Sequence, residues 1–234
     1  MPERVQKGQG TMRAFTFENA TKIYFGGGCV KEHLLEAVKP YGETVMLAYG
    51  GGSIKTNGIY QEVMDVLKLA GKQVIEFSGI MPNPTYSKVM EGKKVVQENQ
   101  VDLILAVGGG SVMDCSKAIS MAAATDKDVW EEYWIKKGEI DFEPVPVGVI
   151  VTVVGTGSEV NGEGVITHEE QKIKTSRNYP RCNPVFAMMD PKYTYTVSPL
   201  QTAAGGCKRR KRFVSKRRIV KGASQAPYIA KPKT

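Results

Sequence analysis

The stretch Leu103-Ile104-Leu105-Ala106-Val107-Gly108-Gly109-Gly110-Ser111 is the part of the sequence that decides the fold. Five consecutive apolar residues are typical of a strand buried on both faces, as in a parallel sheet. The glycines end this strand, and an apolar pattern of helical period follows over 112–124, with Asp114 in the first turn of the expected helix. A strand, a glycine turn and a helix in this order indicate an α/β protein.

The same alternation precedes this stretch. Short apolar runs at 45–49 and 74–77 predict two more buried strands, and a helix-period pattern over 59–70 separates them until Gly71 stops it. A weaker helical pattern over 85–99 follows Pro82-Asn83-Pro84. Strands that alternate with helices predict a parallel sheet joined by right-handed crossovers.

Three further elements are expected after residue 140. The apolar run 147–154 predicts another central strand, and 185–189 predicts one more, closed by Asp190-Pro191. Residues 164–174, with His168-Glu169-Glu170-Gln171 in the middle, predict a hairpin with a polar turn.

Composition divides the chain into three parts. It has 234 residues, 41% hydrophobic and 24% charged, as in ordinary globular proteins. Residues 207–234 hold 11 of the 32 basic residues and no acid, so 21 basic residues face all 24 acids over 1–206, a net charge of −3. We expect an N-terminal extension at 1–11, one folded domain at 12–206 and a disordered basic tail that contacts nucleic acid weakly and without sequence preference.

Several classes of protein are excluded by what the sequence lacks. No apolar run approaches the roughly 18 residues of a membrane helix, and the first residues contain no signal-like segment. The four cysteines are far apart and form no C-x-x-C pair, so no disulfide framework or cysteine zinc site is expected. The sequence predicts a cytoplasmic protein.

Two glycine triplets, each followed by serine, are the candidate ligand-binding loops. Gly50-Gly51-Gly52-Ser53 and Gly108-Gly109-Gly110-Ser111 both follow predicted strands. Glycines let a pyrophosphate reach backbone N–H groups, and a helix N-terminus adds partial positive charge. The alternative is that the glycines only make turns. Neither G-x-G-x-x-G nor a P-loop motif is present. Lys55 and the absence of an acid directly after Tyr49 favour a 2′-phosphate, and hence NADP, over NAD.

No catalytic residue can be assigned from the sequence. Gly155-Thr156-Gly157-Ser158-Glu159 is not a nucleophile elbow, and Ser158 is expected to cap a helix. His33 and His168 lie far apart in the sequence and are expected to be solvated or locally bonded rather than metal ligands. Cys115 is expected to act as a small apolar side chain.

Several ordered motifs between Phe15 and Gly205 resemble the N-terminal half of the iron-containing alcohol dehydrogenases, in particular their NADP-dependent butanol dehydrogenase and aldehyde reductase branch. The matching motifs are Tyr49–Tyr60, Gly108–Lys117, Thr156–Glu159 and Pro184–Thr194.

The resemblance implies a Rossmann-like dinucleotide-binding domain of the dehydroquinate-synthase-like fold, followed in relatives by a helical domain that holds iron or zinc. It also implies a hydride-transferring oxidoreductase that acts on small aldehydes or primary alcohols. The oligomeric state stays open, with a homo-oligomer as one alternative. The residues that the resemblance assigns to the cofactor are Gly109, Gly110, Ser111 and Asp114 near the pyrophosphate and nicotinamide, Thr152 and Thr156 along the cofactor, and Lys174 near the nicotinamide ribose.

The sequence departs from the family pattern after Gly205. Relatives carry an aspartate, the first metal ligand, where this chain has Lys208, and no histidine follows. No metal is therefore expected in this chain. Three functions stay open: a dehydrogenase of which this chain carries the cofactor half, an NADP-binding module without turnover, and a nucleic-acid or acidic-surface binder acting through the basic tail.

Overall fold

A six-stranded parallel sheet forms the centre of the protein, which we describe from a computed structural model over residues 19–198 and 202. The strand order is β1-β8-β5-β4-β2-β3, and every neighbouring pair is parallel. The strands are β1 (Lys22–Phe25), β2 (Thr44–Tyr49), β3 (Gln73–Phe77), β4 (Leu103–Gly108), β5 (Val147–Val151) and β8 (Phe186–Met189). The predicted α/β class and its parallel sheet are confirmed.

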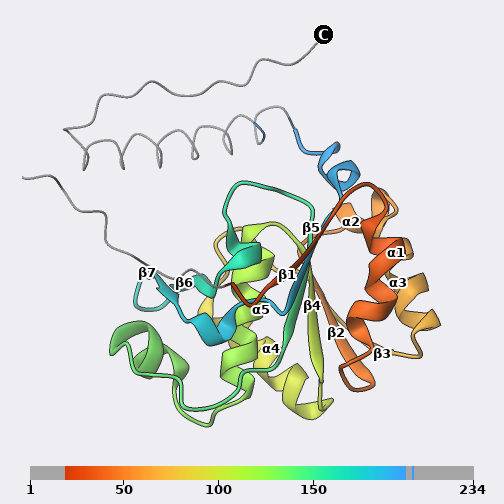
Figure 1. Cartoon of the computed structure of the whole chain (residues 1–234). Helices are drawn as coiled ribbons and strands as arrows, with labels where there is room; N and C mark the ends of the chain where they lie inside the picture. The colour runs from red at the N-terminus through yellow and green to blue at the C-terminus, as the bar shows by residue number, and fades with distance from the viewer. Residues whose placement is uncertain (1–18, 199–201, 203–234) are drawn as a thin grey trace, which may run out of the picture.

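Helices cover both faces of this sheet (Figure 1). One face carries α1 (Cys29–Val38) and α3 (Ile59–Leu69), with the short α2 (Ser53–Thr56) at the sheet edge; the other carries α4 (Tyr86–Glu98) and α5 (Gly110–Ala123). The antiparallel hairpin of β6 (Glu163–His168) and β7 (Ile173–Asn178) packs against α5 from outside. A π-helix, η1 (Trp130–Ile135), and three 3₁₀ turns complete the described part: η2 (Ser158–Val160), η3 (Pro180–Cys182) and η4 (Pro191–Thr194).

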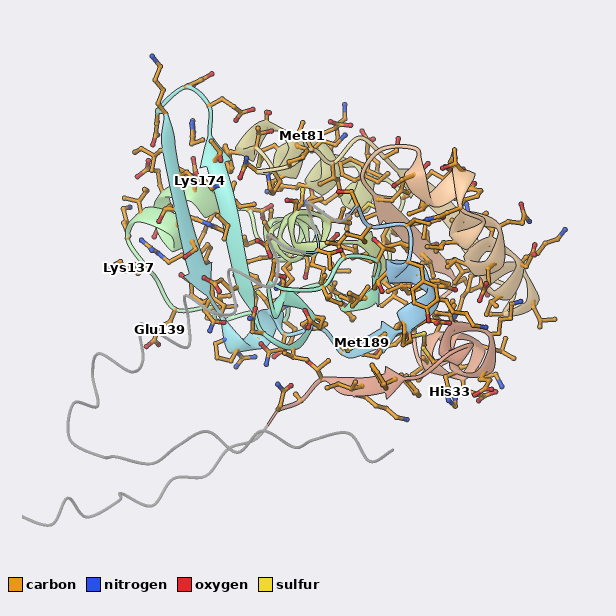
Figure 2. The ribbon with its side chains drawn as sticks, turned by 90° about the horizontal axis from the view of Figure 1, so that it is seen from above. His33, Met81, Lys137, Glu139, Lys174 and Met189 are labelled. Carbon is orange, nitrogen blue, oxygen red and sulfur yellow. The ribbon has the colours of Figure 1, made fainter. Side chains whose placement is uncertain are left out.

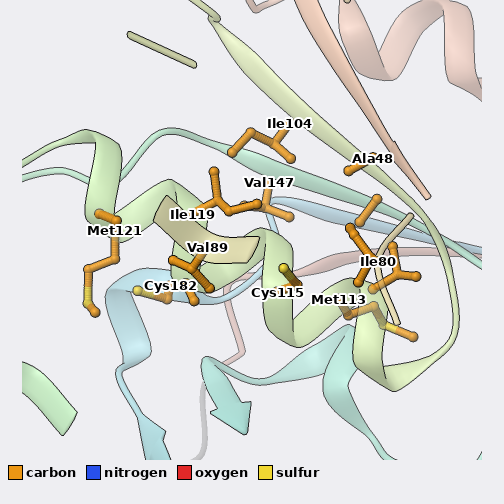
Figure 3. Close-up of a cluster of buried hydrophobic side chains, with 14 of the residues drawn as sticks. Ala48, Ile80, Val89, Ile104, Met113, Cys115, Ile119, Met121, Val147 and Cys182 are labelled. Atoms are coloured by element: carbon orange, nitrogen blue, oxygen red, sulfur yellow. The ribbon is translucent and has the colours of Figure 1, made fainter. Parts of the chain in front are cut away.

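The core consists of two apolar layers, one on each face of the sheet. Because successive strand residues point to opposite faces, Ile104 and Ala106 pack under α4 and α5, whereas Leu103, Leu105 and Val107 pack under α1 and α3. All six residues of β4 are buried, which explains why its sequence is apolar without alternation. Figure 3 shows the layer under α5.

The buried cysteines belong to this core. Cys115 and Cys182 lie among apolar side chains in Figure 3, and burial raises the pKa of each thiol to about 12. Neither thiol ionises at neutral pH, so the prediction that Cys115 acts as a small apolar side chain is confirmed.

Two predicted boundaries are wrong, and both errors affect the site. β5 ends at Val151 rather than Val154, and Val153 and Val154 lie in an exposed loop. The helix predicted from Val112 begins at Gly110, so Asp114 lies beyond its first turn. Gly109 and Gly110 let the backbone enter the helix earlier than the apolar pattern shows, whereas apolar residues alone do not show where the pairing of β5 ends.

The predicted extension at 1–11, the domain boundaries at 12 and 206 and the basic tail at 207–234 all lie outside the described residues. Within the described part, none of the helices has the length and apolar character needed to cross a bilayer.

Candidate cofactor-binding site

Three loops meet where the neighbouring strands β2, β4 and β5 end. Tyr49 pairs with Val107, and Gly108 pairs with Val151, so the residues that follow each strand leave the sheet at the same edge. The N–H of Thr152 donates to the Gly108 carbonyl at 3.0 Å, which joins the third loop to the second. Ligands of open parallel sheets bind at this carboxyl edge.

The first glycine triplet, Gly50–Gly52, borders open space. A Cβ on Gly51 or Gly52 would have no atom within 4 Å, whereas one on Gly50 would lie 3.1 Å from the Ile80 carbonyl oxygen. Neither Gly51 nor Gly52 has a positive φ, so the backbone conformation does not require glycine there. Bare backbone facing open space at a strand end fits a bound phosphate and is not explained by turn geometry.

The second triplet, Gly108–Gly110, is tightly packed. A Cβ on Gly110 would lie 2.6 Å from a Thr156 side-chain carbon, and one on Gly109 would lie 3.0 Å from Val153 Cβ. These glycines let the loop after β5 close onto the N-terminus of α5. The helix begins with no side chain capping it from Gly109, so its first N–H groups face the same edge.

Asp114 and Lys117 join α5 to the loop after β5. Lys117 Nζ donates to the Ser158 carbonyl at 2.9 Å, to Ser158 Oγ at 2.7 Å and to the Asn161 carbonyl at 2.9 Å. Ser158 Oγ in turn donates to Asp114 Oδ1 at 2.5 Å, and the N–H of Val165 in β6 donates to Asp114 Oδ2 at 3.2 Å. The hydrogen bonds of Asp114 that the structure shows are thus internal.

Burial governs the protonation of this pair. It lowers the pKa of Lys117 to about 8, although Asp114, 4.0 Å away, acts in the opposite direction. It also raises the pKa of Asp114, against the hydrogen bond from Ser158 and the charge of Lys117. The expectation that Ser158 caps a helix is wrong: Gly157 occupies that position with φ +77°, and Ser158 instead links Asp114 to Lys117.

Lys174 lies on the hairpin of β6 and β7 (Figure 2). It lies in β7 opposite Thr167, and its ammonium donates to the side-chain oxygen of Asn83. Asn83 belongs to the loop after β3, which is held to the first triplet because the N–H of Gly79 donates to the Gly50 carbonyl at 2.9 Å. The loop therefore connects Lys174 to the edge that carries the glycine triplets.

Lys55 stands beside the first triplet in a polar cluster that sequence reasoning missed. Its ammonium lies 3.0 Å from a carboxylate oxygen of Glu76 in β3, which also accepts hydrogen bonds from the hydroxyls of Tyr49 and Tyr60. Glu76 is 21 residues from Lys55, and only the β2–β3 register brings them together. The signal for this contact in the sequence is the acid Glu76 within the strand predicted at 74–77.

The two histidines are locally bonded, as predicted. His33 stacks on Tyr24 with ring centroids 4.9 Å apart, on the α1 side. His168 stacks on Tyr86 at 5.1 Å and accepts an N–H from Gln171 at 3.4 Å. Within 19–198 and 202, no three histidine, cysteine or acidic side chains stand together in a group that could hold a metal ion.

Fold and site together define an α/β dinucleotide-binding domain. The sequence profile of the iron-containing alcohol dehydrogenases matches residues 20–191. The chain belongs to this family of oxidoreductases, and the predicted resemblance is confirmed.

The chain spans about half the length of the relatives that it matches. The chain is 44% identical over 194 residues to a probable NADH-dependent butanol dehydrogenase of Bacillus subtilis, and 39% identical over 195 residues to the NADPH-dependent aldehyde reductase YqhD of Escherichia coli. Each match covers 83% of this chain and 49% of the relative. The crystal structure of an NADH-dependent butanol dehydrogenase A from Thermotoga maritima superposes with a TM-score of 0.81 at 36% identity, over 87% of this chain and 50% of that protein.

Proposed function

We propose that this chain is the cofactor-binding half of an alcohol dehydrogenase that transfers hydride between NADP(H) and a small aldehyde or primary alcohol. The observation that carries this proposal is the meeting of three glycine- and threonine-containing loops at the carboxyl edge of β2, β4 and β5. The names of relatives support the reaction class, since they include butanol dehydrogenases and an aldehyde reductase.

Different residues of the site are proposed to bind different parts of the cofactor. Gly51, Gly52 and Ser53 give a phosphate access to backbone and hydroxyl groups, and Lys55 supplies a cation. Gly109, Gly110 and Ser111, at the N-terminus of α5, would hold the pyrophosphate. When bound, the nicotinamide would supply or accept the hydride.

The loop after β5 and the hairpin complete the proposed site. Thr152 and Thr156 would line the cofactor from the side of β5, and Lys174, which donates to Asn83, would contact the nicotinamide ribose from the hairpin. Asp114 holds the loop after β5 and the hairpin in place, because it accepts hydrogen bonds from the Ser158 hydroxyl and from the Val165 N–H.

The family metal does not fit the described residues, because no group of three suitable ligands stands together among them. This observation favours a second candidate, an NADP-binding module that does not turn over substrate by itself. The two candidates share the same cofactor site.

The exposed apolar residues of β1 bear on whether this chain associates with a second copy of itself. Ile23 and Phe25 of the edge strand β1 are 52% and 74% exposed, as apolar side chains at an oligomer interface would be. We propose self-association for this chain.

Preference for the phosphorylated cofactor tests the proposed site. A Cβ at Gly51 would have no atom within 4 Å, so the fold of Gly51→Asp should persist while its carboxylate opposes a 2′-phosphate. We expect wild-type chain to bind NADPH more tightly than NADH, and Gly51→Asp to reduce that ratio about tenfold or more, measured by calorimetry. Equal affinities in the wild type, or an unchanged ratio in the variant, would contradict the proposed preference.

A further inference from the structure

The carboxylate of Glu76 is the centre of the polar cluster beside the first glycine triplet. It accepts hydrogen bonds from the Tyr49 hydroxyl at 2.5 Å, the Tyr60 hydroxyl at 2.6 Å and the Lys55 ammonium at 3.0 Å. These partners come from the end of β2, from α3 and from α2 respectively. Glu76 thus ties the helix that follows the triplet to the strand next to it.

The cation of this cluster is enclosed by the same groups. Lys55 Nζ lies 4.5 Å from the ring centroid of Tyr60 and 5.4 Å from that of Tyr49, in addition to its contact with Glu76. Hydrogen bonds from the two tyrosines and from Lys55 lower the pKa of Glu76 to about 2, while Tyr49 and Glu76 raise the pKa of Lys55. Lysine and glutamate are therefore both charged at neutral pH, and the pair has no net charge.

We propose that Glu76 is a specificity-determining residue for the cofactor, which weakens the preference for a 2′-phosphate by opposing it and by holding Lys55. A phosphate that approaches Lys55 must share the ammonium with a carboxylate 3.0 Å from it. A ribose 2′-hydroxyl can instead donate to that carboxylate. This inference rests on the proposed function and names the residue that tunes its cofactor choice.

The geometry distinguishes Glu76 from an ordinary surface ion pair. Lys55 and Glu76 are 46% and 41% exposed, so solvent screens their attraction, but two tyrosine hydroxyls fix the carboxylate in place. A fixed charge keeps its effect on an incoming anion because it cannot swing away.

The test compares Glu76→Gln with the wild type in the full 234-residue chain, with NADPH and NADH titrated separately. Glutamine keeps the size and removes the negative charge; its amide oxygen can accept from one tyrosine hydroxyl, and its NH2 group donates to the oxygen of the other. We expect the ratio of NADPH to NADH affinity to rise about three- to tenfold. Lys55→Met should change the ratio in the opposite direction.

The matched control is Glu98→Gln. Glu98 is an exposed carboxylate at the C-terminal end of α4, paired with Lys94 at 3.7 Å, and α4 leads from there to the start of β4, away from the carboxyl edge. This variant should leave the affinity ratio unchanged.

The salt dependence of the affinity ratio is a readout that would not change if Glu76 had a purely structural role. Removing the charge of Glu76 leaves Lys55 uncompensated, so the NADPH preference of Glu76→Gln should fall more steeply with salt than that of the wild type. If the variant binds both cofactors but its ratio is unchanged or lower, the inference about Glu76 is wrong and the proposed function stands. If wild type and variants bind neither cofactor, the proposed function fails, and this inference fails with it.

Discussion

The Lys117→Met variant is expected to lose about 3–5 kcal/mol of unfolding free energy, the usual effect of removing one partner of a buried ion pair. Lys117 is 2% exposed and donates to Ser158 and Asn161 while facing Asp114 at 4.0 Å. Without the ammonium, these carbonyls and the Asp114 carboxylate stay buried with fewer partners. Urea unfolding followed by circular dichroism measures the loss.

The control for this variant is Lys94→Met on α4, whose side chain is 74% exposed, and we expect a change within about 0.5 kcal/mol. The double variant Asp114→Asn/Lys117→Met should be more stable than the sum of the single changes implies, because it removes both charges. A loss below about 1 kcal/mol for Lys117→Met would show that the network contributes little.

The pH dependence of stability provides a second readout for Lys117. Its folded-state pKa of about 8 lies below the ordinary value of 10.5. Between these two values the unfolded chain binds more protons at this site, so the contribution of Lys117 to stability increases as pH rises from 8 to 10.5. Lys117→Met should lack this increase.

The sheet could be predicted from the sequence because its strands are buried on both faces and therefore uniformly apolar. Leu103–Val107 has no reading other than a buried segment, and the glycines after it mark where it ends. The predicted end of β5 is wrong for the same reason. Val153 and Val154 continue the apolar run in the sequence, but in the structure they lie outside the sheet and are exposed. A run of valines cannot show where pairing stops.

The site was only partly predictable. The glycine triplets can be recognised in the sequence as candidate ligand-binding loops, but the hydrogen-bond partners of Lys55 and Lys117 cannot. Glu76 becomes a partner of Lys55 through strand register, and Ser158 reaches Lys117 through a turn 41 residues further on. Such long-range contacts depend on tertiary structure, and periodicity and spacing carry no information about them.

Turnover by the 234-residue chain is the second large expected effect. We expect aldehyde reduction with NADPH to be slower by about three powers of ten or more than in a full-length relative assayed in parallel. Hydride transfer puts negative charge on the aldehyde oxygen, and a Lewis acid stabilises that charge by several kcal/mol, at about 1.4 kcal/mol per factor of ten.

The described residues offer no such group. His33 and His168 lie on α1 and at the end of β6, bonded to different neighbours, and no cluster of metal-binding side chains stands among residues 19–198 and 202. The assay follows NADPH oxidation with butanal, with and without added ferrous or zinc ions, alongside analysis of bound metal. Stoichiometric metal together with metal-dependent turnover would refute the expectation.

The central claim, that three loops at the carboxyl edge of the sheet hold the cofactor, is tested most directly by hydrogen–deuterium exchange of the chain with and without NADPH. The account predicts slower exchange for amides of 50–53, 108–111 and 152–158, with little change in α4. Protection confined to other segments, or no protection at saturating NADPH, would contradict it.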